Sequence, residues 1–553
     1  MPLLDSVVGD LRSTLWILLG AVGFVLLVAV ANVANLFLVR AEEGQQPTAV
    51  RAALGAGRVR LLRGSLAESL TLALAAGAVG LALAGAAVAA LRRMAPVEVP
   101  RLHEVRLDPT VAGVSLAACL AAALLFGLLP LLGGSRRPLA GRLRDAGRHA
   151  TGGRRRVRGR NLLVAAQVAL ALVLLIAAGL MFRTFANLRG ADLGFAHRQA
   201  LTFEIALPEA RYPSRAEARQ LHRRLLERLA ALPGVEAVGA VAQCLPLVPS
   251  MCWGETLQAE GRPTPEGQVP PVTGARIATP DYFRTLGIPL RGRPFTLADE
   301  EGAEPVAILS EAAAAAYFPG EEALGERITF GGDDAVWYRI VGVAGDVAAR
   351  VGSDDFQRLV YLPLLPRGED GTPALRLGYV LRTAVPPSSL APAVRAALAE
   401  LDPLVPLADV RTLDDRIDEA LAPTAFTLAL LAIAGGLALL LGTVGLYGVV
   451  AYAVSRRSGE IGVRLALGAS GAAVVRMVLG QGGAVVLAGT AVGLLAALGL
   501  TRLMEAMLVG VSPTDPASFA LLTLLLLAVA AGALWIPARR AARVSPSEAL
   551  RND

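Results

Sequence analysis

Seven long stretches of the sequence contain no charged residue, and this feature limits most strongly what the chain can fold into. They are Ser13–Val39, Ser69–Leu91, Pro109–Ser135, Asn161–Phe182, Ala422–Ser455, Met477–Thr501 and Ala517–Ala538. As helices rising 1.5 Å per residue, all are long enough to cross a hydrocarbon core of roughly 30 Å. Only 18% of the 553 residues are charged, against about a quarter in soluble domains. Buried helices of a soluble core are usually shorter and interrupted, so we predict a polytopic α-helical membrane protein with about 7 transmembrane helices.

The composition of these stretches indicates bundled helices and not isolated anchors. Glycine and alanine are frequent, as in residues 75–78 and 434–436, and small residues let helices approach closely in lipid. Cys119 is expected to be a packing residue within its stretch. Four amides also lie there: Asn32, Asn35, Gln167 and Gln481. We expect them to bond between helices and not to bind substrate. No stretch contains an acidic residue, which disfavours a proton-coupled secondary transporter.

The arginines predict the orientation of the chain, which contains no lysine. The short segment Arg136–Arg160 carries ten arginines and one acid, so it is expected in the cytoplasm. Alternation then places residues 40–63, 456–476 and the C-terminus inside, and residues 92–108, 502–515 and about 184–421 outside. The net charge of +7 does not require nucleic acid as a partner, because a basic loop beside an anionic membrane explains it better than an RNA-binding tail.

This orientation places the N-terminus outside, beside Asp5 and Asp10. Met1 is not followed by a basic region and an apolar core, so no signal peptide is recognised. Residues 1–12 resemble the tail of an external domain. We therefore expect that an upstream helix and domain are missing, either in the protein itself or through a misplaced start.

The external segment has the pattern of an α+β domain. Strands are predicted at Gln199–Pro208, Val235–Val241, Arg376–Thr383 and Val405–Val410, and helices at Ser214–Leu232 and Ser388–Leu401. They form two β-α-β units, one on each side of a middle part at about 245–375 that is rich in glycine, proline and short strands. Cys244 and Cys252 both lie in this external segment, and the sequence leaves open whether they form a disulfide.

An internal repeat relates the two ends of the chain. Val50–Ala56 recurs as Val463–Ala469, each copy between two uncharged stretches. Further collinear matches follow: Asp108-Pro109 with Asp515-Pro516, Pro130 with Pro537, and Leu143-Arg144 with Leu550-Arg551, all at offsets of 407–413 residues. The chain is therefore predicted to hold two homologous halves, of which the first lacks its lead helix and external domain.

Three segments resemble the FtsX/MacB-type ABC transporter permeases: Arg456–Ser470, Pro537–Arg551 and Tyr282–Ile288. The duplicated form resembles the acidobacterial-type fused permeases, here N-terminally truncated. The resemblance implies the following organisation: a remnant of an external segment at 1–12; a first FtsX-like permease half at 13–160, with transmembrane helices at 14–39, 67–91 and 110–133 and a basic cytoplasmic loop at 134–160; the lead transmembrane helix of the second half at 161–183; a MacB-like periplasmic core domain at 184–421; and a second FtsX-like permease domain at 422–553, with transmembrane helices at 423–453, 477–501 and 517–537.

In this family the loop after the second span forms a short coupling helix that docks on a separate ATPase. Glu460 and Arg464 have the i,i+4 spacing of a helical ion pair, and Gly468 stands where a helix would stop. Three apolar residues are expected to anchor the helix to the bundle: Ile461, Leu465 and Leu467. The alternative is a solvated amphipathic loop near the lipid headgroups. The candidate ATPase-coupling residues are Arg456, Arg457, Glu460, Ile461, Arg464, Leu467, Gly468, Arg51, Leu54 and Gly55.

The first half departs from the pattern of the second. Pro47 stands where the repeat has Glu460, and Gly44 where it has Arg457. The second half is therefore expected to make the productive contact with the ATPase, while the first docks more weakly or is degenerate.

No catalytic, cofactor-binding or metal site is predicted in this chain. A phosphate-binding P-loop requires a lysine, and there is none, so ATP is expected to bind to a partner subunit. The four histidines, His103, His149, His197 and His222, lack metal-ligand spacing. Neither a HExxH nor a GxSxG motif occurs.

Two functions remain open. One is an export-type permease of the inner (plasma) membrane, with the ATPase and the C-terminus on the cytoplasmic side and residues 184–421 in the periplasm. The other is an FtsX-like signalling permease that activates a cell-wall hydrolase and moves no substrate. A periplasmic adaptor and a homodimeric assembly are compatible with the resemblance. The substrate class stays open among drugs, peptides, lipids and lipoproteins.

Overall fold

The computed structural model describes residues 3–43, 58–94, 108–134, 152–242, 245–246, 254–262, 272–301, 304–331, 336–348, 351, 358–364 and 375–543. The chain divides into two compact units. The helical unit comprises Met1–Phe185 and Pro423–Asp553, and the sheet unit comprises Ala186–Ala422.

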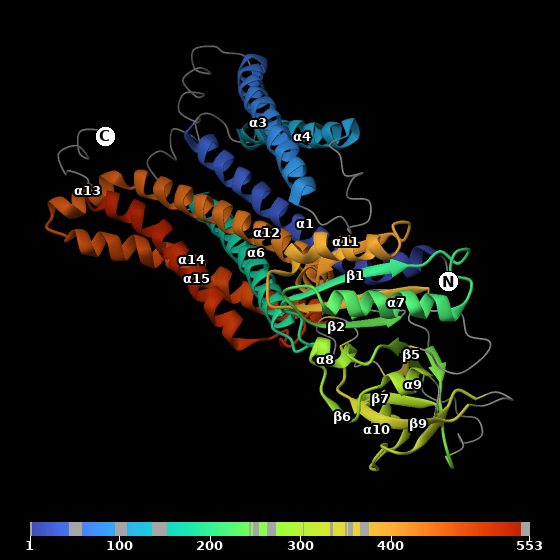
Figure 1. Ribbon diagram of the computed structural model, residues 1–553. Helices are drawn as coiled ribbons and strands as arrows, with labels where there is room; N and C mark the ends of the chain where they lie inside the picture. The colour runs from blue at the N-terminus through green and yellow to red at the C-terminus, as the bar shows by residue number, and fades with distance from the viewer. Residues whose placement is uncertain are drawn as a thin grey trace. The chain divides into compact units, whose positions relative to one another are not determined.

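The helical unit contains long apolar helices (Figure 1). They are α1 (Leu3–Glu43), α3 (Arg58–Met94), α4 (Pro109–Gly134), α6 (Gly152–Arg189), α12 (Leu413–Ser455), α14 (Gly471–Leu500) and α15 (Pro516–Ala541), with the short helices α13 (Ser458–Ala466) and η3 (Thr501–Met507). Among the described residues, six candidate spans are long and apolar enough to cross a membrane: Thr14–Asn35, Leu70–Ala90, Arg158–Arg189, Leu413–Ser455, Gly471–Met507 and Pro516–Ala541. These six correspond to six of the seven predicted stretches.

The seventh predicted stretch forms helix α4 over Pro109–Gly134. The apolar part of α4 among the residues whose side chains the structure describes is Pro109–Ala121, which is shorter than a span. The number of candidate spans in the described residues is therefore six, while a crossing by α4 stays a prediction.

Helix α6 forms the centre of the helical unit. In its most apolar segment, 61% of the residues are buried, against 33% or less in the corresponding segments of the other five candidate spans. Gly489 and Gly493 of α14 pack directly on it: a Cβ atom at Gly489 would lie 2.6 Å from the carbonyl oxygen of Ala165, and one at Gly493 would lie 2.9 Å from Cα of Ala169. This contact agrees with the expectation that small residues allow close helix packing.

The sheet unit is built on one sheet, in which twelve strands are described. The strands are β1 (Ala200–Ala206), β2 (Val235–Ala242), β3 (Gly254–Thr256), β4 (Gln258–Ala259), β5 (Val272–Ala278), β6 (Leu290–Gly292), β7 (Val306–Ser310), β8 (Arg327–Thr329), β9 (Tyr338–Ala344), β10 (Leu359–Pro363), β11 (Arg376–Thr383) and β12 (Leu407–Thr412). Their order is β12-β1-β11-β2-β5-β10-β7-β9-β8-β4, with β3 paired to β5 and β6 paired to β9.

The described part of the sheet unit also contains helices. They are α7 (Arg215–Ala230), α8 (Tyr282–Leu286), α9 (Leu297–Glu301), α10 (Glu311–Tyr317), η2 (Pro387–Leu390) and α11 (Ala391–Leu401). The predicted β-α-β units are present as β1-α7-β2 and β11-α11-β12, and their four strands are neighbours in the sheet. Ser214 caps α7, because its side chain accepts a hydrogen bond from the backbone N–H of Glu217.

Two hydrophobic clusters hold the sheet unit together. The first lies between α7, α11 and the strands of the β-α-β units, with Leu225, Leu229 and Val394 fully buried. The second lies in the middle part, around α10 and strands β5, β7, β9 and β10. The predicted division into two β-α-β units and a middle part of short strands is therefore confirmed at the level of elements.

Candidate functional site

The candidate coupling residues of the second half form helix α13, between the end of α12 and the start of α14. The helix is stabilised along its length by the predicted ion pair, in which Nη2 of Arg464 lies 2.6 Å from Oε1 of Glu460. Both side chains are about half exposed, so this pair contributes only a few tenths of a kcal/mol. Its main effect is to fix the direction of the two charges on the helix surface.

The end of α13 is a Schellman motif centred on Gly468. The φ angle of Gly468 is +93°, in the left-handed region that favours glycine. The N–H of Gly468 donates to the carbonyl of Leu465 at 3.1 Å, and the N–H of Ala469 donates to that of Arg464 at 2.9 Å. Ser470 then caps α14 through the N–H of Ala473. The predicted helix stop at Gly468 is therefore confirmed.

One face of α13 is anchored to the helical unit. Ile461 is 2% exposed and forms a small cluster with Val474 of α14 and Ala541 of α15. Leu465 is partly buried against the same cluster. The predicted anchoring role of Ile461 and Leu465 is therefore confirmed.

The expectation that Leu467 also anchors the helix is wrong. Leu467 is 83% exposed, the highest value among the exposed large apolar residues of the described chain. The reason is helical periodicity: at 3.6 residues per turn, Leu467 lies about 200° from Leu465 and on the same face as Val463, to whose carbonyl its N–H still donates at 2.9 Å. Val463, which the sequence reasoning did not single out, is 43% exposed. Together they form an apolar exposed edge on α13 beside the charges of Glu460 and Arg464.

Polar contacts tie the ends of α13 to the neighbouring helices. Nη1 of Arg457, in the turn between α12 and α13, donates to Oε1 of Gln481 in α14 at 3.0 Å, so this amide bonds to the connection between two helices. Arg464 also approaches the sulfur of Met477, with Nη1 at 2.9 Å. Arg456 and Arg457 are both exposed. The contacts fix the position of α13 while they leave the two arginines at the surface.

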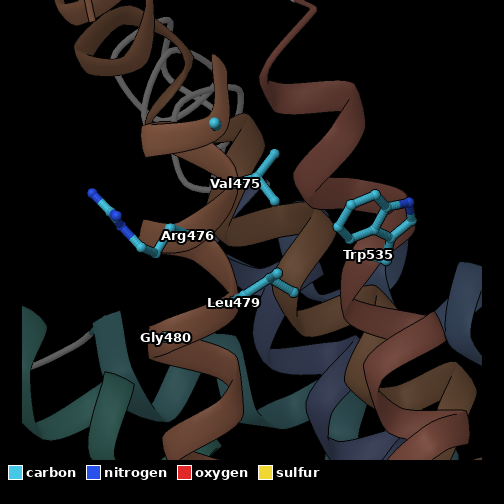
Figure 2. A pocket seen from close by; sticks show the side chains of 6 residues that line it. Val475, Arg476, Leu479, Gly480 and Trp535 are labelled. Carbon is cyan, nitrogen blue, oxygen red and sulfur yellow. The ribbon is translucent and has the colours of Figure 1, made fainter. Parts of the chain in front are cut away.

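A shallow apolar groove of about 550 Å³ lies beside these residues, on α14 and α15. It is lined by Ala472, Val475, Arg476, Leu479, Gly480 and Trp535. Figure 2 shows the side chains of Val475 and Leu479 between their helix and Trp535, while the Arg476 side chain extends away from Trp535. An open apolar lining of this kind is what lipid chains cover in a membrane protein.

Several predicted site residues lie outside the described residues. They are Arg51, Leu54, Gly55, Cys244 and Cys252. The first-half coupling segment and the disulfide therefore stay predictions. Among the residues that the structure describes, no group of three or more His, Cys, Asp or Glu side chains is placed to hold a metal ion.

Comparison with protein families matches most of the chain. The MacB-like periplasmic core domain matches residues 163–401. The FtsX-like permease C-terminal domain matches twice, at residues 19–139 and 432–546. The two FtsX-like matches fall in the two parts of the chain that the internal repeat relates.

Curated relatives are macrolide export ATP-binding/permease proteins named MacB. The protein of Shigella sonnei is 29% identical over 283 residues, which cover 49% of this chain and 42% of the relative. The protein of Azoarcus sp. is 25% identical over 335 residues, which cover 58% of this chain and 47% of the relative. That of Escherichia coli K12 is 28% identical over 283 residues, with 49% and 42% covered. This chain thus spans less than half the length of these relatives.

Two solved structures that resemble part of this chain are extracytoplasmic domains. The periplasmic region of MacB from Actinobacillus actinomycetemcomitans is 16% identical, with a TM-score of 0.28, and the match covers 42% of this chain and 95% of that one. The extracellular domain of the noncanonic ABC-type transporter YknZ from Gram-positive bacteria is 16% identical, with a TM-score of 0.24, covering 36% and 91%. Scores this low carry no weight for function, and the family assignment rests on the sequence matches.

Proposed function

Because the chain belongs to the family of FtsX- and MacB-like ABC transporter permeases, we propose that it is a permease subunit whose ATPase is a separate chain. ATP hydrolysis in that partner moves α13, the helices transmit the movement, and the MacB-like domain changes conformation outside the membrane. The result is export or extraction of a substrate. This substrate is not identified by any residue of the chain.

The observation that carries the proposal is the exposed apolar edge of α13. Leu467, at 83% exposure, is the most exposed large apolar residue of the described chain, and it stands in the segment that resembles the ATPase-docking loop of the family. Exposed apolar residues next to defined charges are typical of a protein contact. Because Ile461 and the Schellman motif hold the helix firmly, a force on Leu467 and Val463 is passed to α12, α14 and α15.

Helix α12 supports a mechanical role. It runs without a break from Leu413 to Ser455. It therefore begins among residues of the sheet unit and ends two residues before α13. A continuous helix suits transmission between ATPase and external domain better than a flexible linker. Pro423, inside α12 at the boundary between the two units, is the point where it can bend.

The sidedness in this proposal follows from the arginines. Residues 456–476 and the C-terminal arginines lie on the cytoplasmic side, and the sheet unit lies in the periplasm. Arg456, Arg457, Arg539 and Arg540 all occur at ends of candidate spans near α13, where the positive-inside rule places such residues.

The experiment that tests the proposal is a substitution of Leu467. The tagged chain is purified from membranes of its host, and the ATPase that co-purifies is measured by its amount and its ATP turnover. Leu467→Asp is expected to lower both about tenfold or more, the size of effect expected when a central apolar contact is lost. Glu460→Arg, which reverses a charge on the same surface, is expected to act in the same direction.

The matched control is Leu503→Asp. Leu503 lies in η3, at the other end of α14, and is 71% exposed. This variant tests the same chemical change on a surface that is not proposed to bind the ATPase. Unchanged co-purification with Leu467→Asp, in protein that still inserts into the membrane, would refute the coupling role of α13.

A further inference from the structure

A buried polar junction joins three helices inside the helical unit. Asn32 of α1 is 6% exposed, and its Nδ2 donates to the carbonyl of Leu441 in α12 at 3.2 Å. Gln167 of α6 is fully buried, and its Nε2 donates to the carbonyl of Val28 in α1 at 3.3 Å. Both amides thus bond between helices, as the sequence predicts. Gly445 of α12 completes the junction.

The space at Gly445 is filled by the two amides. A Cβ atom built there would lie 2.9 Å from Oδ1 of Asn32 and 2.9 Å from Oε1 of Gln167. Within the described residues neither oxygen accepts a hydrogen bond. The hydrogen that glycine carries in place of Cβ therefore points at both oxygens, the arrangement of a weak Cα–H···O contact. Any side chain at position 445 would displace at least one amide.

The junction follows the internal repeat of the chain. The offset of 413 residues that relates Val50 to Val463 also relates Asn32 to Gly445 and Val28 to Leu441. The two carbonyls that accept the amides therefore stand at equivalent positions of α1 and α12. At the position that faces the junction, one helix has the amide and the other has the glycine.

Because of this difference, α1 fits against α12, whereas neither helix fits against a second copy of itself. Two copies of α12 facing each other in this way would bring glycine against glycine and leave Leu441 without the amide donor. Two copies of α1 would bring asparagine against asparagine, where the geometry above leaves no room for the second side chain. In lipid, packing and hydrogen bonds drive helix association, so such a mismatch discriminates between partners.

Apolar contacts continue the same seam along α1. Val28 is fully buried and Ala21 is 6% exposed, and both belong to the cluster that α6, α12, α14 and α15 form. Ile17 and Phe24 pack against this cluster. By contrast, residues on the opposite side of α1, such as Val30 at 49%, are exposed. One face of α1 is thus fitted to the second half of the chain.

We propose that Asn32 and Gly445 are a matched pair that makes α1 of the same chain, and not a second copy of the protein, the partner of α12. The two homologous halves then pair within one molecule, in a defined order. This assignment concerns assembly and does not depend on docking of an ATPase on α13.

The test is a disulfide between Asn32→Cys and Gly445→Cys. The Cγ atom of Asn32, which occupies the position that Sγ has in a cysteine, lies 3.5 Å from the Cβ position at Gly445. This is close to the roughly 3 Å between Sγ of one cysteine and Cβ of the other in a disulfide. The full chain is expressed with Cys119, Cys244 and Cys252 replaced by serine and with a protease site inserted at residues 264–269. After oxidation in membranes, non-reducing electrophoresis of the uncleaved and the cleaved protein separates the outcomes.

The expected result is a cross-link within one chain: before cleavage the oxidised protein runs at the mass of the monomer, and after cleavage its two fragments stay together and separate only on reduction. A band at twice the chain mass before cleavage would show that α12 pairs with a second copy, and absence of any cross-link would show that the helices are not neighbours; either result overturns the proposal. The control pair is Val30→Cys with Val444→Cys. These residues are 49% and 50% exposed and should not cross-link within the chain.

A swap of the two residues tests the matching directly. Asn32→Gly removes an amide and Gly445→Asn adds one, so each is expected to lower the apparent melting temperature of the solubilised chain by several degrees. The double variant restores one amide and one glycine and is expected to recover most of the loss. If the double variant loses at least the sum of the two single effects, the residues are not a matched pair.

Discussion

At the scale of single residues, Asp402 shows how a buried charge is held in the sheet unit. Its carboxylate is 4% exposed and accepts hydrogen bonds from the Tyr212 hydroxyl at 2.7 Å and from the N–H of Leu404 at 3.0 Å. Nε of Arg211 lies 2.9 Å away. These groups, the Tyr212 hydroxyl first, lower the pKa of Asp402. The charged form is therefore favoured by folding.

A pH dependence follows from the direction of this shift. Because the pKa of Asp402 is lower in the folded state, its stabilisation is present above the unfolded pKa of about 4 and is lost as the pH falls through and below that value. Tyr212→Phe removes the strongest donor, so it is expected to cost about 1 kcal/mol at pH 7 and to flatten the loss of stability between pH values of about 5 and 3. Unfolding of the solubilised protein monitored across this pH range checks both effects.

The control for Tyr212 is Tyr317→Phe. The Tyr317 hydroxyl makes a hydrogen bond of 2.9 Å with the hydroxyl of Thr273, a neutral partner. This variant is expected to lower stability equally at all pH values in the range. A Tyr212→Phe protein with the same pH profile as the control would contradict the role of Asp402.

At the scale of elements, the sequence predicts helices and strands well where the pattern is local. The strands β1, β2, β11 and β12 and the helices α7 and α11 lie where alternation and 3.6-residue periodicity place them. The pairing of strands that are far apart in the sequence could not be predicted in this way. The register of β1 with β11 joins Ala200 to Arg382, and no local pattern contains that information.

The ends of the long helices were not predictable from charge-free stretches. The sequence suggests that α12 begins near residue 422, whereas the helix starts at Leu413. The added turns contain Asp414 and Asp415, which suit the first turn of a helix because of its dipole. A search for charge-free stretches cannot include these acidic residues. The exposure of Leu467 could have been predicted, because the 3.6-residue period places it on the face of Val463 and away from Ile461 and Leu465.

The end of α13 gives a prediction about its backbone. Gly468 has a φ of +93° and no atom within 4 Å of its Cβ position, so a substitution acts through the backbone alone. Gly468→Ala is expected to destabilise the end of α13 by about 1 kcal/mol, and Gly468→Asn by less, because asparagine tolerates the left-handed region. Hydrogen exchange of the α13 amides should then be about fivefold faster in the alanine variant.

The control here is Gly480→Ala in α14. Gly480 also has no atom near its Cβ position, but its backbone is helical. Alanine is the better helix former, so this change should leave exchange in α13 unaltered. Equal exchange rates for the alanine and asparagine variants at Gly468 would mean that the left-handed conformation does not limit the stability of α13.

At the scale of the whole molecule, two homologous halves and one large extracytoplasmic-type domain share a single chain. The two FtsX-like matches, at residues 19–139 and 432–546, agree with the proposed pairing of Asn32 with Gly445 in relating the two halves. In the proposed function the sheet unit is the external domain. This arrangement requires α13 and the sheet unit to lie on opposite sides of the membrane.

Cysteine labelling tests that requirement. In a chain whose three cysteines are replaced by serine, single cysteines are introduced at Glu322 in the sheet unit, at Leu467 beside α13 and at Leu503 in η3, all exposed positions. A membrane-impermeant maleimide is expected to label Glu322→Cys and Leu503→Cys in intact spheroplasts and Leu467→Cys only after lysis, because α14 carries the chain across the membrane between Leu467 and Leu503.

Each pair of positions tests a separate part of the topology. Leu467 and Leu503 flank α14, so labelling of both from the same side would mean that this helix does not cross the membrane. Leu467 and Glu322 are separated by α12, so labelling of both from one side would end the proposal that α12 links an ATPase to an external domain. Because the positive-inside rule fixes all these assignments from the same arginines, a reversed pattern at all three positions would instead keep the spans and invert the orientation. Binding of an ATPase at α13 would then be excluded on location alone.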